Sequence, residues 1–533
     1  MIKNLTFGAE ARKQLRAGID KIANAVKLTL GAKGRNVAIT KYGAIPHNTK
    51  DGVTVVKSIM LKDPAENMGA LMVKDVAQKT VEVAGDGTTT ATVLFQSIVG
   101  KIDEALEAED APLEIKDGIE TAVRDVVGEL KSRSVNITDE NFSVINDIAA
   151  ISANNDSVIG SLIYDAYEKV GIDGIVTAEN SNSNENSLLT VDGLLIDRGY
   201  INVGFVTNKS KMSAEMDNPV VVIVNKTIVY TQDILKLVQD AVKVNKPLLI
   251  IAEDVIGEAM SFLLMNLKQG GIPKGVCVIK APSFGEERNL FLDDIATVTG
   301  ATIISDDAGI LLKDASLVHF GKAEKITVDK HRTIIAKGGG DFEAINLRIS
   351  ELKDMISSDG ITDFERDFAK RRLAKIKNGI AVIKIGGFTE TEVVEKRDRV
   401  DDALCAVRSA IDEGFVAGGG ATLTKISAKL RSKKFEHLSF GFSLGYNVVL
   451  DSINEPYNQI LKNGGVDPSK HDVSMLLEGE GYDIKNKKYS DLLKVGIIDP
   501  IKVIRVALEN AASVGCLYLT TECVISEDLE SIN

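Results

Sequence analysis

Apolar residues near the start of the chain recur at intervals of three and four, which is the spacing of one face of an α-helix. Between residues 5 and 30 this stripe consists of Leu15, Ile19, Ile22, Val26 and Leu30. The pattern predicts a long amphipathic helix that the glycines of GAKGR end. The next segment, RNVAITKYGAIPHNTKDGVTVVK, is predicted to form strands joined by turns. Two more helices are expected on either side of AGDGTTT.

The middle of the chain has a different pattern. Short and nearly continuous apolar runs at 219–226, 246–254 and 274–282 alternate with segments of helical periodicity. Strands of a parallel sheet are covered on both faces and therefore appear as continuous apolar runs. The alternation of such strands with helices predicts an α/β domain with a largely parallel sheet.

Helical patterns return toward the end of the chain. Residues 340–378 are strongly charged and helical, 380–387 is predicted to be a strand, and the chain from about 402 onward is mostly helical. VAGGGA at 416–421 interrupts this last region. Helical ends thus flank an α/β middle. If the two ends form one domain, the middle is an insertion, which is tolerated where chain termini lie close together.

Length and composition limit the class of protein. A chain of 533 residues is too long for one ordinary core, so two to four domains are expected. The net charge of −13 and the 5% aromatic content argue against a nucleic-acid partner, which needs a basic surface and stacking platforms. The four cysteines are irregularly spaced and include no CxxC pair, so we expect reduced thiols and no zinc site.

The sequence also lacks signals for export or membrane insertion. Its first residues have no apolar h-region, and no window reaches the roughly 18 apolar residues of a membrane span. We therefore expect a soluble, cytoplasmic protein that has no membrane partner.

The stretch AGDGTTTATVL at 84–94 is the first candidate for chemistry. Its glycines let backbone amides approach a ligand, and Thr88, Thr89 and Thr90 open a helix whose first amide groups can bind an anion. Asp86 would repel a bare phosphate, but it suits a magnesium ion placed between carboxylate and phosphate. A simple turn followed by a threonine-capped helix explains the same residues. The stretch alone leaves both interpretations open.

Other residues add to the candidate chemistry without deciding it. Asp51 lies in the tight turn TKDGVT, and Asp402 lies in RVDDALCAVRSAI, where acidic residues also favour the helix dipole. Further glycine-rich loops occur at 29–35 and 416–421. The pattern GxxxxGK[ST] is absent, which excludes a P-loop, and without GxSxG acyl-transfer chemistry has no support.

These pieces occur together in an order that resembles the group I chaperonins, the GroEL family, from residue 3 to about 526. The matching motifs are TLGAKGRNV, TKDGVTV, ENMGALMVK, AGDGTTTATVL, AAISANND, DRGY, KPLLIIAEDV, RVDDALCAVRSAI, VAGGGA and GIIDPIKV. DGTTT alone is shared with the group II chaperonins, whereas ENMGALMVK is typical of group I. The joint occurrence of these motifs in one register makes the resemblance highly specific.

The resemblance implies a multidomain subunit with a mainly helical equatorial domain, a small α+β intermediate domain and an α/β apical domain. The equatorial ATP-binding domain would comprise 1–133 and 413–533. The intermediate domain would comprise 134–191 and 381–412, and the apical polypeptide-binding domain 192–380. By this resemblance, such a subunit would form rings of seven copies and act as an ATP-dependent protein-folding chaperone.

The resemblance also implies an ATP site with Mg²⁺ and K⁺ as cofactors. Asp51 and Asp402 would be catalytic, Asp86 would bind magnesium and Thr29 would lie at the potassium. The nucleotide would contact Thr29, Leu30, Gly31, Ala32, Lys50, Asp86, Gly87, Thr88, Thr89, Thr90, Gly419, Asp483, Ile484 and Asp499. Non-native polypeptides and a GroES-type cochaperonin would bind exposed apolar residues, namely Tyr200, Phe205, Leu235, Val238, Met260, Leu264 and Met265.

Several positions depart from the family pattern. Ala32 replaces a proline, and Asp483, Ile484 and Lys485 replace the Asn-Ala-Ala that contacts the adenine. Asn458 replaces an arginine that the family uses between two rings, which leaves single and double rings open. Two alternatives to the chaperone also stay open, a non-hydrolysing chaperonin-like scaffold and a small-molecule kinase. Intact Asp51, Asp86 and Asp402 argue against the scaffold, and no acceptor pocket supports the kinase.

Overall fold

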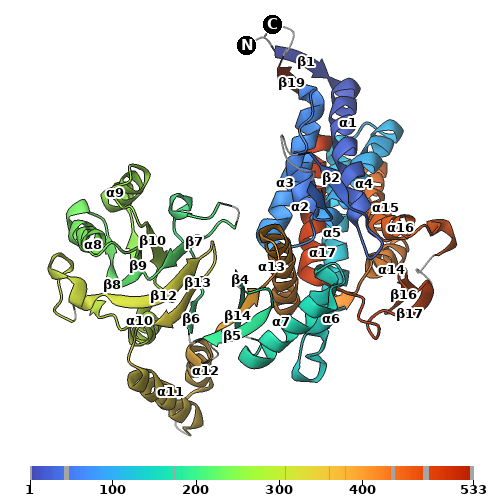
Figure 1. Cartoon of the computed structure of the whole chain (residues 1–533). Helices are drawn as coiled ribbons and strands as arrows, with labels where there is room; N and C mark the ends of the chain where they lie inside the picture. Colours follow the sequence, from blue (N-terminus) through green and yellow to red (C-terminus); the bar gives the residue numbers. More distant parts are fainter. Residues whose placement is uncertain are drawn as a thin grey trace. The chain divides into compact units, whose positions relative to one another are not determined.

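The computed structural model describes residues 3–40, 47–172, 174–181, 183–191, 193–209, 211–306, 308–358, 361–377, 380–433, 439–471 and 479–527. The chain forms two compact units (Figure 1). The first, here called the helical unit, combines residues 1–164 and 389–533, and the second, the sheet unit, consists of residues 165–388. The two ends of the chain thus pack together. The finer division into three domains remains a prediction.

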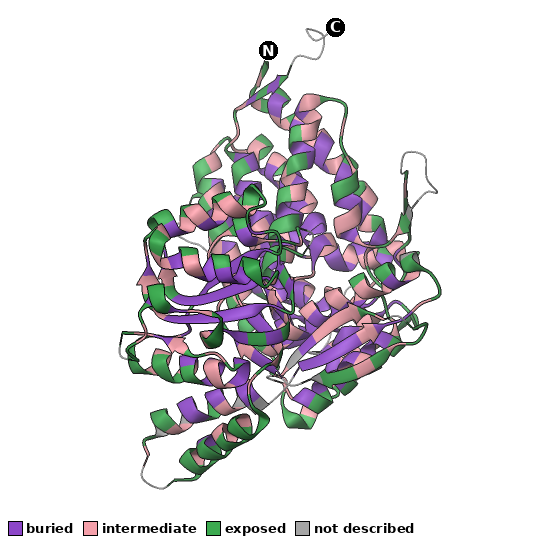
Figure 2. Ribbon diagram, turned by 60° about the vertical axis from the view of Figure 1, so that its left-hand side comes forward, coloured by how far each residue is buried: buried purple, intermediate pink, exposed green. Residues whose placement is uncertain are grey.

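Long helices lying side by side build the core of the helical unit. They are α1 (Gly8–Val26), α3 (Pro64–Ala84), α4 (Thr88–Ala108), α5 (Pro112–Ser132), α15 (Phe440–Ser452) and α17 (Ile501–Leu519). α1 packs against α3, α4 against α17, and α5 against α15. Figure 2 shows buried residues on the sides of these helices that face one another and exposed residues on their outer sides. The predicted stripe of α1 is buried from Leu15 to Val26, but Leu30 lies beyond the end of the helix.

Shorter elements complete the helical unit. Its other helices are α2 (Gly52–Ser58), α6 (Val144–Ser152), α7 (Ser157–Val170, which continues into the sheet unit), α13 (Glu390–Glu413), α14 (Ala421–Leu430) and α16 (Glu455–Asn463). Its antiparallel strand pairs are β1 (Lys3–Phe7) with β19 (Cys523–Glu527), β2 (Val37–Ile39) with β3 (His47–Thr49), β15 (Phe415–Ala417) with β18 (Ile498–Pro500), and β16 (Glu480–Asp483) with β17 (Lys488–Asp491).

The prediction of strands throughout residues 35–57 is wrong in its last part, because residues 52–58 form helix α2. Asp51 is the reason, since its carboxylate accepts hydrogen bonds from the amides of Val53 (3.0 Å) and Thr54 (2.9 Å). These bonds satisfy amide groups that the first turn of a helix leaves without a partner, and they outweigh the strand preference of valine and threonine.

The sheet unit is built around an eight-stranded sheet. Its main order is β10 (Val276–Lys280), β9 (Leu248–Val255), β8 (Val220–Ile228), β12 (Gly321–Val328), β13 (Thr333–Gly338), β6 (Gly193–Ile196); β11 (Ile303–Ile304) pairs with β8 and β7 (Ala214–Asp217) with β12. The three predicted strands β8, β9 and β10 are parallel. The other half of the sheet is antiparallel, so the expectation of a largely parallel sheet is only partly correct. β12 buries alternate residues, as a strand covered on one face does.

Helices and a second sheet complete the sheet unit. The helices are α8 (Thr231–Lys243), α9 (Gly257–Lys268), α10 (Gly285–Thr299), α11 (Phe342–Ser357) and α12 (Asp363–Lys377). The small sheet has the order β4 (Ile175–Asn180), β14 (Ile380–Ile385), β5 (Ser187–Val191). Glu179 links the two sheets, because it pairs with Lys384 (2.6 Å) on β14 and with Lys325 on β12.

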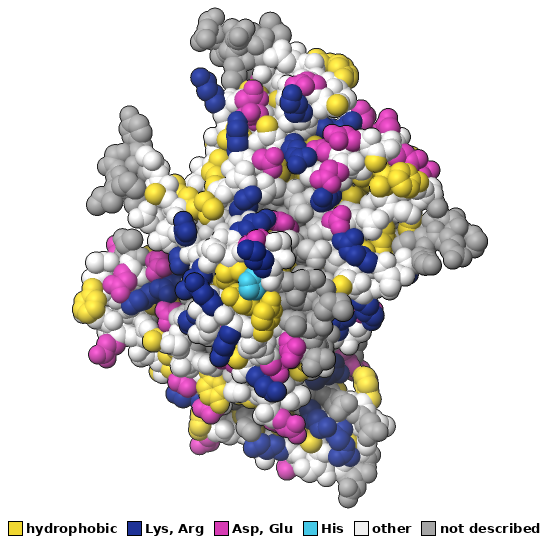
Figure 3. Space-filling model, turned by 90° about the vertical axis from the view of Figure 1, so that its right-hand side faces the viewer, with side chains coloured by type: hydrophobic (Ala, Val, Ile, Leu, Met, Phe, Trp, Pro, Cys, Tyr) yellow, Lys and Arg dark blue, Asp and Glu magenta, His cyan; other side chains and the backbone are white. Residues whose placement is uncertain are grey.

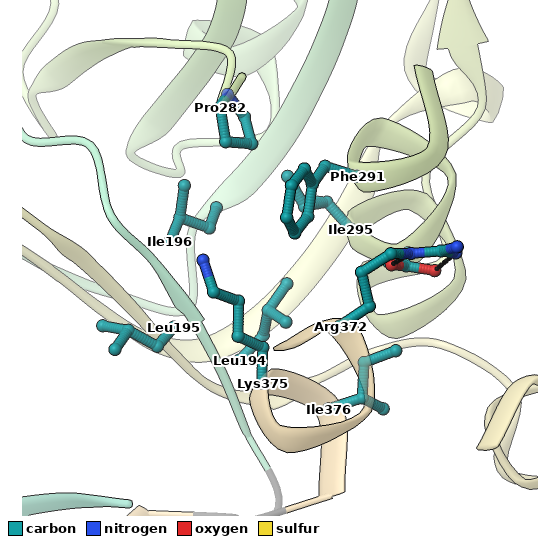
Figure 4. Close-up of a pocket in the computed structure, with 10 residues that line it drawn as sticks. Leu194, Leu195, Ile196, Pro282, Phe291, Ile295, Arg372, Lys375 and Ile376 are labelled. Carbon is teal, nitrogen blue, oxygen red and sulfur yellow. Dashed lines mark hydrogen bonds and ion pairs between the residues drawn. The ribbon is translucent and has the colours of Figure 1, made fainter. Parts of the chain in front are cut away.

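A small cavity between β6, α10 and α12 is a gap in the packing of these elements rather than a ligand site. Its volume is about 10 Å³, room for little more than one water molecule. Figure 4 shows the side chains of Ile196 and Phe291 on opposite sides of it, with Ile376 farther down on α12. Beside it the buried Arg372 donates to the carboxylate of Asp294 from Nε (2.6 Å) and Nη2 (2.7 Å). A buried charge held by a bidentate partner of this kind fixes how α12 packs on α10.

The surface carries both signs of charge, although the net charge is −13. On the face shown in Figure 3, acidic and basic side chains are interspersed, with small groups of hydrophobic side chains between them. Among the described residues, none of the helices combines the length and the apolar character that crossing a lipid bilayer requires.

Candidate functional site

A large cleft in the helical unit contains all the residues that the sequence pointed to for nucleotide binding and catalysis. Its volume is about 1360 Å³. The predicted residues that line it are Thr29, Leu30, Gly31, Ala32, Lys50, Asp51, Asp86, Gly87, Thr88, Thr89, Thr90, Asp402, Gly419, Asp483, Ile484 and Asp499. They come from loops and helix ends separated by hundreds of residues in the sequence. The fold therefore brings the glycine-rich loops and the carboxylates into one cavity.

The N-terminus of α4 opens into this cleft without a side-chain cap. Its N-cap residue is Gly87, and no side chain bonds to the first amides of the helix. The interpretation of the threonines as helix caps is therefore wrong, and these amides are available to an anion. Gly87 has φ 91°, and a Cβ atom there would lie 2.6 Å from Cγ1 of Val503. Only glycine fits this position.

Asp86 lies half-buried between α3 and α4. One carboxylate oxygen accepts a hydrogen bond from the Gly87 amide (2.5 Å), and the other accepts from the Ser152 hydroxyl (2.7 Å) at the end of α6. Burial raises the pKa of Asp86, and the negative charge of Asp51 raises it further. The sequence analysis did not single out Ser152, although it belongs to the motif AAISANND.

Asp402 reaches the same cleft from α13. Its pKa is raised well above the ordinary value, first by burial and then by the charges of Asp86 and Asp51. Three carboxylates from separate parts of the chain are therefore close enough to act on one another. Such an arrangement costs free energy unless a cation or a proton is shared among them, and it is typical of functional sites.

Asp51 has a structural role in addition to its place in the cleft. As the N-cap of α2 it accepts bonds from two amides, and its second oxygen also accepts from the Thr54 hydroxyl (2.5 Å). α2 starts close to α4, since a Cβ atom on Gly52 would lie 2.4 Å from Oγ1 of Thr89. The helix cap thus holds a carboxylate beside the start of α4.

The loop after α1 forms another wall of the cleft. The Thr29 hydroxyl donates to the carbonyl of Val26 (2.8 Å), which leaves its oxygen lone pairs for other partners. Asn463, at the end of α16, donates to the carbonyls of Lys27 (2.8 Å) and Leu30 (2.9 Å). Asn463 therefore fixes the path of this loop. No local pattern distinguishes it from an ordinary helix-terminal asparagine.

Gly419 and Asp499 form a further wall of the cleft. The pairing of β15 with β18 brings these two residues together. Burial raises the pKa of Asp499 to about 6, although the backbone amides of Gly420 and Gly419 favour its charged form. A carboxylate held by backbone amides at the cleft wall keeps acceptor positions for a polar ligand such as a sugar.

The residues present fit a magnesium ion held jointly by protein and phosphate. The groups that act most on the pKa of Asp86 are neutral or negative, so this carboxylate would suit a cation. The described residues contain no set of three His, Cys, Asp or Glu side chains able to hold a metal by themselves. Magnesium is usually bound by one or two carboxylates together with phosphate oxygens and water, so this finding agrees with it.

Comparison with known proteins identifies the family. Residues 22–528 match the TCP-1/cpn60 chaperonin family. The chain belongs to this family. The crystal structure of the chaperonin gp146 from the bacteriophage EL 2 (Pseudomonas aeruginosa), in the presence of ATP-BeFx, superimposes with a TM-score of 0.72 in crystal form II and 0.63 in crystal form I. The identity is 21%, and each match covers 98% of this chain and 99% of that chain.

This agreement confirms the chaperonin resemblance and the multidomain, GroEL-like fold. The chaperonin's sheet unit, however, corrects part of the predicted polypeptide-binding surface. Phe205, Val238 and Tyr200 are buried in its core, so their expected exposure is wrong. Met260 and Leu264 are partly buried, and Leu235 and Met265 are exposed. A helix face needs apolar residues for its own core contacts, and the sequence pattern does not separate these from residues that serve a partner.

The raised pKa of Asp499 leads to a prediction for stability in the chaperonin without metal or nucleotide. The folded state holds this proton up to about pH 6, whereas an unfolded aspartate loses it near its model value of 3.8. Ionised Asp499 therefore destabilises the folded chain above pH 6. We expect Asp499→Asn to gain on the order of 2 kcal/mol at pH 7.5.

Thermal midpoints measured between pH 5 and 8 check this prediction. The gain from Asp499→Asn should shrink toward pH 5, because the folded state takes up the proton below about pH 6 and then no longer buries a negative charge at this position. Asp75→Asn, at an exposed aspartate of α3 that pairs with Lys79, is the matched control and should leave the midpoint nearly unchanged. An equal gain at every pH would contradict the explanation by ionisation.

Proposed function

We propose that this chaperonin is a magnesium-dependent ATPase that uses the cycle of nucleotide binding and hydrolysis to fold proteins. The observation that carries the proposal is the cleft in which three carboxylates meet an uncapped helix N-terminus. The amides of Thr88, Thr89 and Thr90 would bind phosphate oxygens, and Lys50 would add a positive charge on the cleft wall. Gly419 and Asp499 would contact the ribose side.

Asp86 would hold the magnesium ion, and Thr29 would supply an oxygen to a potassium ion. Bound magnesium supplies charge neutralisation and orientation of the phosphate chain. Because one oxygen of Asp86 is engaged by Ser152, this hydroxyl orients the carboxylate from α6. The fit of this carboxylate to a cation supports the assignment.

Asp402 would orient the attacking water and take up its proton, and Asp51 would assist. Burial and neighbouring carboxylates raise the pKa of Asp402, and a general base works best when its pKa lies near the working pH. Asp402 stands on α13 and Ser152 on α6, and these two helices pack against each other, so they would supply one wall of the site together. Phosphoryl transfer needs mainly positioning and charge stabilisation, which this set provides.

The protein-folding part of the proposal concerns the sheet unit. Exposed apolar side chains on α8, α9 and the turns beside them include Val203, Leu235, Ile256 and Met265. Exposed apolar groups of this kind usually serve an interaction, here with non-native polypeptides and with a GroES-type cochaperonin. We infer that the chain assembles into a ring, as the family does, with ATP driving capture and enclosure.

Two measurements on the purified full chain test the proposal. Phosphate release from ATP is expected only with magnesium, and negative-stain images with and without ATP are expected to show rings. ATP binding without hydrolysis would favour the non-hydrolysing scaffold. A monomer in both conditions would refute enclosure as the mechanism.

A further inference from the structure

The cleft has a second, apolar region in addition to the carboxylate and amide groups around α4. Tyr457, Ile484 and Leu492 are buried there, with Ile460 and Ile497 packed beside them. If the proposed nucleotide binds with its phosphates at α4, this apolar wall is where its base lies, since flat rings favour such surfaces. The following inference rests on that placement.

The hairpin β16–β17 forms the polar edge of this region. Within its turn, the carboxylate of Asp483 engages most of the groups that could bind a ligand. One oxygen of the buried Asp483 accepts from the amides of Lys485 (2.8 Å) and Asn486 (3.1 Å). Its other oxygen accepts from Nδ2 of Asn486 (2.6 Å). Three of about four acceptor positions of the carboxylate are therefore occupied within the turn.

This turn removes the groups that would read a purine edge. The amides of Lys485 and Asn486 donate to Asp483 instead of to a ligand, and the side chain of Ile484 is apolar and buried. The side chain of Lys485 remains. It is exposed, lines the cleft and carries a charge that the turn does not use.

We infer that Lys485 determines base selectivity in this cleft and that the site accepts guanine as well as adenine nucleotides. An ammonium group only donates hydrogen bonds, so it favours purine-edge acceptors such as O6 and N7 of guanine. The amino group of adenine needs an acceptor, but Asp483 has at most one buried position left, and the side-chain oxygen of Asn486 belongs to an exposed residue where water competes for it. Strong discrimination requires buried polar groups that a wrong base would leave unpaired, and this edge offers few.

Binding of AMP-PNP and GMP-PNP to the full chain with magnesium, measured by calorimetry, tests this inference. We expect the two dissociation constants to agree within about 3-fold, because one partly exposed contact discriminates weakly. Lys485→Ala is expected to weaken GMP-PNP binding by about 5–10-fold and AMP-PNP binding by no more than about 2-fold. Lys488→Ala is the matched control, since Lys488 is exposed on the same hairpin but does not line the cleft.

The outcomes separate this inference from the proposed function. Binding of AMP-PNP at least about 30-fold tighter than GMP-PNP would refute relaxed selectivity and leave the ATPase proposal intact. An equal loss for both nucleotides in Lys485→Ala would refute base reading by this lysine. No binding of either nucleotide would refute the proposed function itself.

Discussion

Asp402→Ala is expected to lower the kcat of ATP hydrolysis by about 10²–10⁴-fold, the usual contribution of a general base. The Kd of ATP should stay near the wild-type value, because Asp402 reaches the cleft from α13 and in the proposed mechanism would act on the water rather than on the phosphates. Removing one of three mutually repelling carboxylates should also stabilise the fold rather than weaken it. Single-turnover hydrolysis and nucleotide titration on the same preparation measure both quantities.

Asp401→Ala provides the matched control for this prediction. Asp401 precedes Asp402 on α13, pairs with Arg397 (3.7 Å) and does not line the cleft. Its loss should leave kcat within about 2-fold of the wild type, because a half-exposed ion pair contributes little. Hydrolysis by Asp402→Ala at the wild-type rate would exclude Asp402 as the base.

Asp86→Ala is expected to affect binding and hydrolysis together. Loss of the carboxylate removes the proposed magnesium ligand, so we expect the affinity for ATP in the presence of magnesium to fall by at least about 10-fold and hydrolysis by at least about 100-fold. Titration of magnesium at fixed ATP distinguishes this effect from a general loss of the site. The variant should require far more magnesium for the same occupancy.

Glu82→Ala is the corresponding control on α3. Glu82 is exposed near the end of this helix and accepts a hydrogen bond from Gln78 (3.0 Å), so its removal should not change the magnesium requirement. If Asp86→Ala bound ATP with the wild-type dependence on magnesium, another group would have to hold the metal. The surviving binding would then point to the amides of α4 as the main phosphate contacts.

Local sequence determined much of the fold. Apolar periodicity specifies α1, and the continuous runs at 219–226, 246–254 and 274–282 became β8, β9 and β10. The glycines of AGDGTTT end α3 at Ala84 and precede the start of α4 at Thr88. These features depend on residues within one or two turns of each other, so the sequence pattern alone is enough to predict them.

The rest depended on contacts between distant residues. Asp51 converts a strand-like segment into α2, and the contact of Ser152 with Asp86 joins residues 66 positions apart. Phe205 and Val238 were expected on a binding surface but pack into the core. An apolar side chain looks the same in sequence whether it faces the core or a partner.

The sequence by itself named the carboxylates Asp51, Asp86 and Asp402, the glycine-rich loops and, through its motifs, the chaperonin family. Only the tertiary structure decided that α4 begins without a side-chain cap, that the charge of Asp51 raises the pKa of Asp86, and that both charges raise the pKa of Asp402. It also decided that Asp483 turns inward and leaves Lys485 at the cleft. The physical reason is that desolvation and charge interaction depend on distances across the folded chain, which spacing along the sequence does not encode.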